Sequence, residues 1–141
     1  MFYLDTSFAA ALFVPDAHSS RALQWLQARA AAALTISAWV RAEFASVLAR
    51  QVRMRRMAAR TADLAIEDFR QWSSTHCEII APAPADFDSA IDLMRDYASG
   101  LRAPDALHLA IARNWGNLTL VAFDASLNAA AVRAGIKIER L

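Results

Sequence analysis

The sequence has 141 residues, 57% hydrophobic and 21% charged, which predicts one folded domain over residues 1–141 and excludes a disordered chain. The net charge of +1 gives no overall attraction for nucleic acid, and no apolar run is long enough to span a bilayer. Asp5 interrupts the only apolar run near the start, so no leader is recognised and a cytoplasmic protein is expected. The single cysteine, Cys77, excludes an internal disulfide and a multi-cysteine zinc site.

Short strands and helices are predicted along the first half of the chain. The apolar run Phe2–Leu4 is too short for a helix and indicates a buried strand, and Pro15 stops the helix that follows it. The next helix is predicted to bury Leu23 and Leu26, and Ser37 is a suitable N-cap for the long helix after it. The predicted elements are a strand at 2–4, helices at 7–14 and 17–32, a strand at 34–36, and helices at 38–55 and 59–75.

The second half continues this alternation. Its first helix is predicted to pack through Phe87, Ile91 and Met94 and to end at Gly100, because glycine adopts the left-handed conformation that ends many helices. Pro104 opens the next helix at a position where its missing N–H costs nothing. The predicted elements are a strand at 77–80, helices at 85–98 and 104–114, a strand at 118–122, a helix at 124–134 and a strand at 136–138.

Strands that alternate with helices from end to end predict an α/β fold. A central, mostly parallel sheet of four to five short strands is expected, with helices on both faces. No linker, internal repeat or low-complexity segment divides the chain.

Four carboxylates fall where such a sheet would bring them together. Asp5 and Asp124 each follow a predicted strand, and the carboxyl ends of parallel strands lie at one edge of the sheet. Asp105 lies in the first turn of its helix, and Glu43 lies early in the long helix, half-facing the core, where an acid needs a partner. The alternative is that the four are unrelated helix caps and surface acids, since aspartate at the position of Asp5 is a good N-cap.

A shared site for these acids predicts a bound cation, because clustered carboxylates repel one another. Oxygen ligands without a paired histidine or cysteine favour Mg²⁺ or Mn²⁺ over zinc. Ions held in this way activate a water molecule and stabilise the leaving oxygen in phosphodiester cleavage.

Short motifs around these acids stand in order along the whole chain. They are Leu4-Asp5-Thr6-Ser7, Glu43, the run from Leu101 to Ala110 (LRAPDALHLA), and Val121-Ala122-Phe123-Asp124 followed by Gly135-Ile136. Together they resemble the PIN-domain family, and more narrowly the small ribonuclease toxins of the VapBC toxin–antitoxin type. The resemblance implies a PIN-like three-layer α/β/α sandwich, a Mg²⁺- or Mn²⁺-dependent endoribonuclease acting on RNA, a cognate antitoxin that inhibits it, and a homodimer.

The resemblance also implies a role for each of the four acids. Asp5 and Asp105 match the strongest metal ligands of the family. Asp124 matches an acid that holds a second ion or binds through water, and Glu43 matches the remaining metal-binding acid.

Three further positions near the acids bear on this site. Thr6 and Ser7 match the small hydroxyl residues that support the first acid by hydrogen bonds. Ala122 departs from the family pattern, in which many relatives have Thr or Ser two residues before the fourth acid. A missing hydrogen bond there puts the occupancy of a second metal in question.

Arginine dominates the cations, since Lys137 is the only lysine. The arginine fork suits phosphate, although a compositional bias toward arginine gives the same count. Arg102 is one turn from Asp105 and is the candidate for RNA contact, or it neutralises the acids. A dense basic run is predicted to bind RNA phosphates, to bind an antitoxin, or to be a solvated surface. It consists of Arg50, Arg53, Arg55, Arg56 and Arg60.

His108 lies on the same helix face as Asp105, where a packing or supporting role is favoured over action on a leaving group. Trp25, Trp39 and Trp72 are predicted to be core or interface residues, and any exposed one would mark a docking site for an antitoxin helix.

Other functions fit the sequence less well. An aspartate-nucleophile phosphatase needs a second aspartate where Ser7 stands, and a phospho-receiver domain needs a lysine after a late strand, whereas Lys137 lies inside one. The alternative from a different class is a PIN-fold module that is catalytically weak and acts by binding RNA or protein, for which Ala122 is the one sequence hint.

Overall fold

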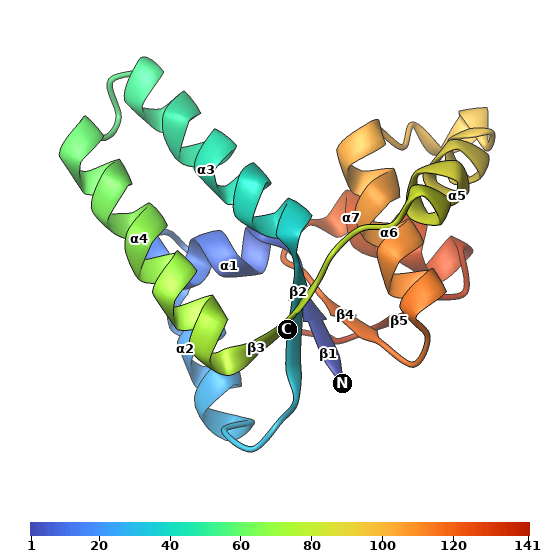
Figure 1. The fold of residues 1–141 in the computed structure, drawn as a ribbon, viewed down its shortest axis with the longest axis horizontal. Helices are drawn as coiled ribbons and strands as arrows, with labels where there is room; N and C mark the ends of the chain where they lie inside the picture. The colour runs from blue at the N-terminus through green and yellow to red at the C-terminus, as the bar shows by residue number, and fades with distance from the viewer.

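The computed structural model describes residues 1–141 and contains one sheet of five parallel strands (Figure 1). The spatial order of the strands is β3-β2-β1-β4-β5. The strands are β1 (Phe2–Leu4), β2 (Leu34–Ser37), β3 (Cys77–Ile80), β4 (Thr119–Val121) and β5 (Lys137–Ile138). The predicted α/β fold with a parallel sheet is therefore confirmed.

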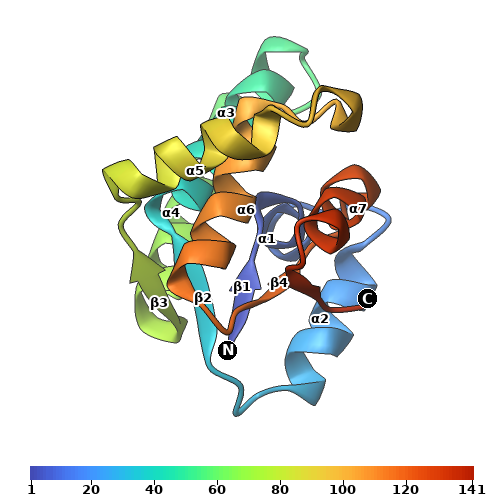
Figure 2. The ribbon, with the colours of Figure 1, turned by 90° about the vertical axis from the view of Figure 1, so that its right-hand side faces the viewer.

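Helices cover both faces of this sheet, so the predicted three-layer arrangement is also confirmed. Helices α1 to α4 lie on one side, and α5, α6 and α7 lie on the other, which is the side that Figure 2 presents. Helices α3 and α6 diverge beyond the carboxyl ends of the strands. The helices are α1 (Thr6–Phe13), α2 (Ser19–Ala28), α3 (Ala38–Arg53), α4 (Ala59–His76), α5 (Pro84–Met94), the 3-10 turn η1 (Tyr97–Ser99), α6 (Ala103–Trp115) and α7 (Ala125–Arg133).

The central strand β1 fixes the position of the sheet edge that matters for function. Tyr3 pairs with Thr35 of β2 on one side and with Leu120 of β4 on the other. The backbone N–H of Asp5 continues the ladder to the carbonyl of Val121 at 3.1 Å. The ends of β1 and β4 are therefore neighbours, as convergence of their terminal acids requires.

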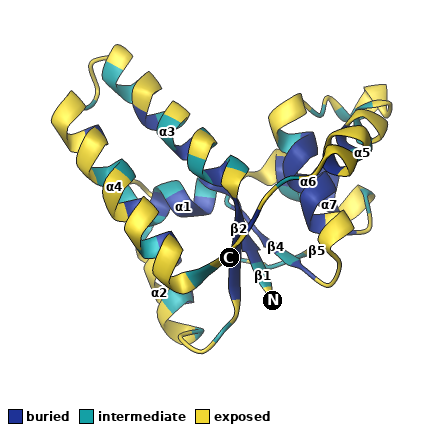
Figure 3. Cartoon of the chain, in the orientation of Figure 1, coloured by how far each residue is buried: buried dark blue, intermediate teal, exposed yellow.

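Burial is concentrated in the three central strands β2, β1 and β4 and in the helix faces that pack on the sheet (Figure 3). Aromatic rings fill the α1–α4 side, where Phe44 and Phe69 meet with ring centroids 4.5 Å apart. Trp39 and Trp72 are half-buried and pack against this core. None of the helices combines the length and the apolar character that a membrane span needs.

Two predictions about helix faces were wrong, and the first concerns α2. The helix is shorter than predicted, and Leu23 is 48% exposed instead of buried, whereas Leu26 is half-buried and packs against the core as predicted. Trp25 takes the buried position, because its ring packs edge-on against both Phe2 and Phe8 at 5.1 Å. Because the large indole of Trp25 packs on these rings, the side of α2 that carries it faces inward.

The second wrong face belongs to α5, which ends at Met94 and not near residue 98. Phe87 and Ile91 are 50% and 52% exposed, whereas Asp86 and Ala90 are buried. Of the three predicted packing residues, Met94 alone packs against the cluster around Ala90. The buried face of α5 carries small side chains because Ala90 packs against alanines of α6, which leaves no room for large ones. Apolar spacing alone therefore indicated the wrong side of this helix.

The remaining elements lie within a few residues of their predicted bounds. Ser37 caps α3 as predicted, with its hydroxyl accepting from the N–H of Val40 at 3.3 Å. Gly100 adopts φ 64° at the end of η1, in the left-handed region expected for it.

Candidate functional site

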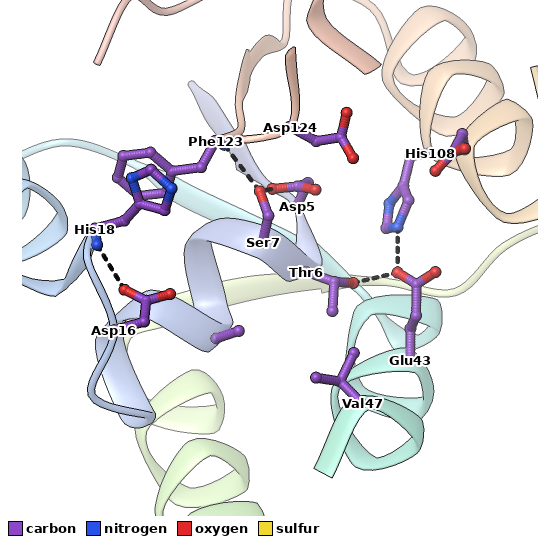
Figure 4. Close-up of a pocket in the computed structure, with 12 residues that line it drawn as sticks. Asp5, Thr6, Ser7, Asp16, His18, Glu43, Val47, His108, Phe123 and Asp124 are labelled. Atoms are coloured by element: carbon purple, nitrogen blue, oxygen red, sulfur yellow. Dashed lines mark hydrogen bonds and ion pairs between the residues drawn. The ribbon is translucent and has the colours of Figure 1, made fainter. Parts of the chain in front are cut away.

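The structure brings all four predicted acids to one pocket at the carboxyl edge of the sheet (Figure 4). The cavity measures about 400 Å³ and opens to solvent. The acids come from four segments: the end of β1, the second turn of α3, the first turn of α6 and the end of β4. The other polar or aromatic residues that line the pocket are Thr6, Ser7, Asp16, His18, His108 and Phe123.

Asp5 is both a helix cap and a wall of the pocket, so the two interpretations of this residue are compatible. Its Oδ1 accepts from the backbone N–H of Phe8 at 3.1 Å and from the hydroxyl of Ser7 at 2.7 Å. The residue is only 4% exposed. Burial raises the pKa of the Asp5 carboxyl above its ordinary value, although the charge of His108 and these hydrogen bonds act in the opposite direction.

Glu43 is held by two side chains from other elements. His108 Nε2 lies 2.8 Å from Glu43 Oε2, and the hydroxyl of Thr6 donates to the same oxygen. Burial alone would raise the pKa of Glu43. The hydrogen bonds from His108 and Thr6 and the charge of His108 outweigh burial, so the pKa lies below its ordinary value. Glu43 is therefore an oriented carboxylate and not a free surface acid.

A buried chain of hydrogen bonds supports His108 from behind. The hydroxyl of Tyr3 lies 3.0 Å from His108 Nδ1 and 2.8 Å from the hydroxyl of Ser37. Because a carboxylate only accepts, His108 donates through Nε2 to Glu43, and Nδ1 of the same ring faces the Tyr3 hydroxyl. Ser37, Tyr3 and His108 are each at most 1% exposed, so this chain is shielded from water.

Asp105 lies beside Arg102 at the first turn of α6. Arg102 Nε is 3.8 Å from Asp105 Oδ2, and the Arg102 side chain is 83% exposed. Burial raises the pKa of the Asp105 carboxyl. The Arg102 guanidinium opposes this shift, and the carboxylates of Asp124 and Glu43 add to it. The last two effects show that the acids act on one another electrostatically.

Asp124 caps α7 and is the most exposed of the four acids. Its Oδ1 accepts from the N–H of Leu127 at 2.9 Å. Ala122 has no side-chain hydroxyl, but the end of β4 is tied to Asp5 by another route. The N–H of Phe123 donates to the Ser7 hydroxyl at 2.8 Å, and that hydroxyl donates to Asp5.

The donor set fits a hard divalent cation by its chemistry, because it consists of carboxylate oxygens, and two of these acids raise the pKa of a third, Asp105. In the arrangement described here, no three acidic, histidine or cysteine side chains converge on one point at ligand distance. Glu43 is turned toward His108 and Thr6. Coordination by several acids at once therefore requires side-chain rotation.

Several other predicted residues lie outside this pocket. The basic run Arg50–Arg60 is exposed from the end of α3 through the following turn to the start of α4, and of its arginines only Arg56 lines a second, neighbouring cavity. Trp25 is buried. Sequence reasoning missed the contributions of Tyr3, Ser37 and Phe123, since their spacing carries no signal for contacts between distant segments.

The family comparison agrees with this geometry. The family model of the PIN domain matches residues 2–133, so the chain belongs to the PIN domain family. The predicted resemblance to VapC-type PIN proteins is confirmed by solved structures. A comparison with curated proteins finds no match.

Three solved structures illustrate the similarity. The Mycobacterium tuberculosis VapC20, described as a sarcin-ricin loop cleaving toxin, is 28% identical over 92% of this chain and 95% of its own, with a TM-score of 0.73. FitAcB from Neisseria gonorrhoeae is 18% identical over 99% of this chain and 97% of its own, with a TM-score of 0.71. VapBC2 from Rickettsia felis, bound to a DNA fragment from its promoter, is 16% identical over 100% of this chain and 99% of its own, with a TM-score of 0.64.

Proposed function

We propose that this protein is a metal-dependent endoribonuclease and the toxin of a type II toxin–antitoxin pair. The observation that carries the proposal is the gathering of four carboxylates in one open pocket of a PIN domain. VapC20, which cleaves the sarcin-ricin loop, supports RNA as the substrate class.

Asp5, Asp105 and Asp124 would hold Mg²⁺ or Mn²⁺, with Glu43 as a fourth acid after rotation or through water. When bound, the ion would activate a water molecule and stabilise the leaving oxygen. RNA would be cleaved to leave a 5′-phosphate and a 3′-hydroxyl.

The protein's own side chains orient these acids. Ser7 fixes Asp5, so this carboxylate is positioned before substrate arrives, whereas Thr6 and His108 hold Glu43 in the orientation from which it would rotate or act through water. The exposed Arg102 lies beside Asp105, which lines the pocket, and would pair with a phosphate of the RNA, since its ion pair with Asp105 at 3.8 Å is weak.

The proposal includes a cognate antitoxin and a homodimer. VapBC2 and FitAcB, whose folds this chain shares, support an antitoxin partner. Phe87, Ile91 and Tyr97 expose apolar surface on α5 and η1, which is compatible with burial against a second chain.

The test is cleavage of a mixed RNA pool by purified protein. Cleavage is expected with Mn²⁺, and not with EDTA or with Asp105→Ala. The exposed acid Asp63 provides the matched control, because Asp63→Ala removes a carboxylate on α4 away from the pocket and should cleave like wild type. Folded wild-type protein that binds Mn²⁺ and RNA without cleaving would favour the binding-module alternative.

A further inference from the structure

We propose that His18 forms a stacking platform for an unpaired nucleobase of the RNA, next to the phosphodiester that is cut. This inference rests on the proposed function and specifies the substrate as a single-stranded or looped segment. It is carried by three observations on His18: its ring geometry, its fixed backbone and its unpartnered ring nitrogens.

The ring of His18 ends a row of near-parallel rings that leads from the core to the pocket. It lies on Phe123 with centroids 4.4 Å apart and an interplanar angle of 17°. Phe123 is also nearly parallel to Phe8, at 5.8 Å and 8°. Phe8 is fully buried, whereas Phe123 and His18 are half-buried and line the same pocket as the acids (Figure 4).

The backbone that carries His18 is fixed before any ligand binds. The N–H of His18 donates to Asp16 Oδ1 at 2.7 Å, and the N–H of Asp16 donates to the Ser19 hydroxyl at 2.9 Å. The Ser19 hydroxyl also reaches the carbonyl of Val14 at 3.3 Å. Because the backbone is fixed and the ring already packs on Phe123, His18 loses little conformational freedom on stacking, so its contact contributes more to binding.

The ring nitrogens of His18 have no hydrogen-bond partner in the protein, which distinguishes it from the other two histidines. His108 bonds through both ring nitrogens, and His76 bonds the carbonyl of Trp72 at 2.9 Å. His18 therefore offers both a π-face and free polar atoms at the pocket rim. A nucleobase presents the matching surface, a flat face with polar edges.

The acids near His18 restrict the kind of group that can bind beside its ring. Carboxylates around the pocket disfavour an anionic group at His18, whereas a neutral base avoids this repulsion. In a duplex, both faces of a base are covered by its neighbours in the stack. Only an unstacked nucleotide can use the platform, so unpaired RNA is expected to be cut in preference to duplex RNA.

The experiment compares His18→Ala and His18→Phe on a short single-stranded oligoribonucleotide that carries a cut site from the RNA pool. We expect His18→Ala to raise KM about tenfold, within a range of roughly 5- to 100-fold, because loss of base–aromatic stacking has this effect. His18→Phe should stay within about threefold of wild type, since it keeps the ring. His76→Ala is the matched control, because His76 also stacks on an aromatic ring but is exposed on α4 away from the pocket.

A second arm tests binding apart from cleavage. The dissociation constant of the same oligonucleotide is measured in the Asp5→Asn background, with and without His18→Ala, and with single abasic substitutions along the RNA. One abasic position should weaken binding when His18 is present and have no further effect when it is absent.

Two results overturn the inference: a wild-type KM for His18→Ala, or an equal loss with His18→Phe. Weaker antitoxin binding by His18→Ala with unchanged RNA cleavage would assign the ring to the protein partner. Absence of RNA cleavage by wild type would instead contradict the proposed function, and the binding arm would still decide the role of His18.

Discussion

Asp5 stabilises the folded protein as a helix cap and destabilises it as a buried charge. It accepts the N–H of Phe8 at the start of α1, which stabilises the helix. It is also a charge with 4% exposure whose pKa is raised by burial, which destabilises the folded protein when the carboxyl is ionised. Stability is given up at this position for a preorganised ligand.

Asp5→Asn is therefore expected to stabilise the metal-free protein while abolishing cleavage. A folded carboxyl with a raised pKa contributes stability below the pKa of the unfolded chain, and this contribution is lost as pH rises through the folded pKa. Asparagine keeps the cap without the charge, so the free energy of unfolding at pH 7 should rise above that of the wild type. Urea denaturation with EDTA measures this. A lower stability than wild type would show that the ionised form makes a favourable contact.

Tyr3→Phe tests the buried hydrogen-bond chain behind Glu43. The substitution leaves the Ser37 hydroxyl and His108 Nδ1 without their shared partner in a site closed to water. The free energy of unfolding should fall by about 1–3 kcal/mol. Tyr97→Phe is the control, because Tyr97 is 89% exposed and the same change there should stay within about 0.5 kcal/mol. Equal effects of the two variants in urea denaturation would contradict a supporting role for Tyr3.

At the scale of elements, the sequence predicted where helices and strands lie better than which sides they bury. Strand bounds and caps follow from local chemistry, as the Ser37 cap of α3 illustrates. The face of α5 does not, because it depends on the alanines of α6 that Ala90 meets. The face of α2 likewise depends on two distant aromatic rings that receive Trp25. Tertiary partners override local periodicity in both helices.

Asp86 holds the start of α5 and offers a test at this scale. Its carboxylate accepts from the N–H of Ala83 at 2.8 Å and from the Asn114 amide of α6 at 2.9 Å, and it is 7% exposed. Asp86→Ala should lower the free energy of unfolding by about 1–2 kcal/mol, since the Ala83 N–H loses its partner and the Asn114 amide loses one of its acceptors. Asp88→Ala, two positions away and exposed, should change it little. Thermal denaturation of both variants distinguishes a cap from a general charge effect.

At the scale of the whole molecule, the candidate site exists only because the parallel sheet brings distant segments together. The sequence could predict the four acids, since each stands at the end of a strand or early in a helix. It could not predict that His108 would face Glu43 or that Tyr3 would support His108. These contacts span 65 and 105 positions and depend on how α3 and α6 pack.

A divalent ion in this pocket would link the ends of β1 and β4 to α3 and α6, so metal and proton should compete for the same acids. The raised pKa values of Asp5 and Asp105 mean that protons compete from a pH above the ordinary aspartate value of 3.8. The increase in Tm caused by Mn²⁺ should be largest at neutral pH and should shrink as the pH falls toward that value. At 100 times the dissociation constant, the ion should add about 2.7 kcal/mol of stability.

Thermal denaturation with Mn²⁺ or EDTA across a pH series measures this competition. Asp105→Ala should lose most of the Mn²⁺ effect at every pH, because it removes one of the two acids with a raised pKa. The exposed-acid variant Asp63→Ala should retain it. A pH-independent increase in Tm, or one that survives in Asp105→Ala, would mean that Mn²⁺ binds elsewhere. Loss of the effect in Asp105→Ala alone would tie the stability of the whole molecule to the carboxyl edge of its sheet.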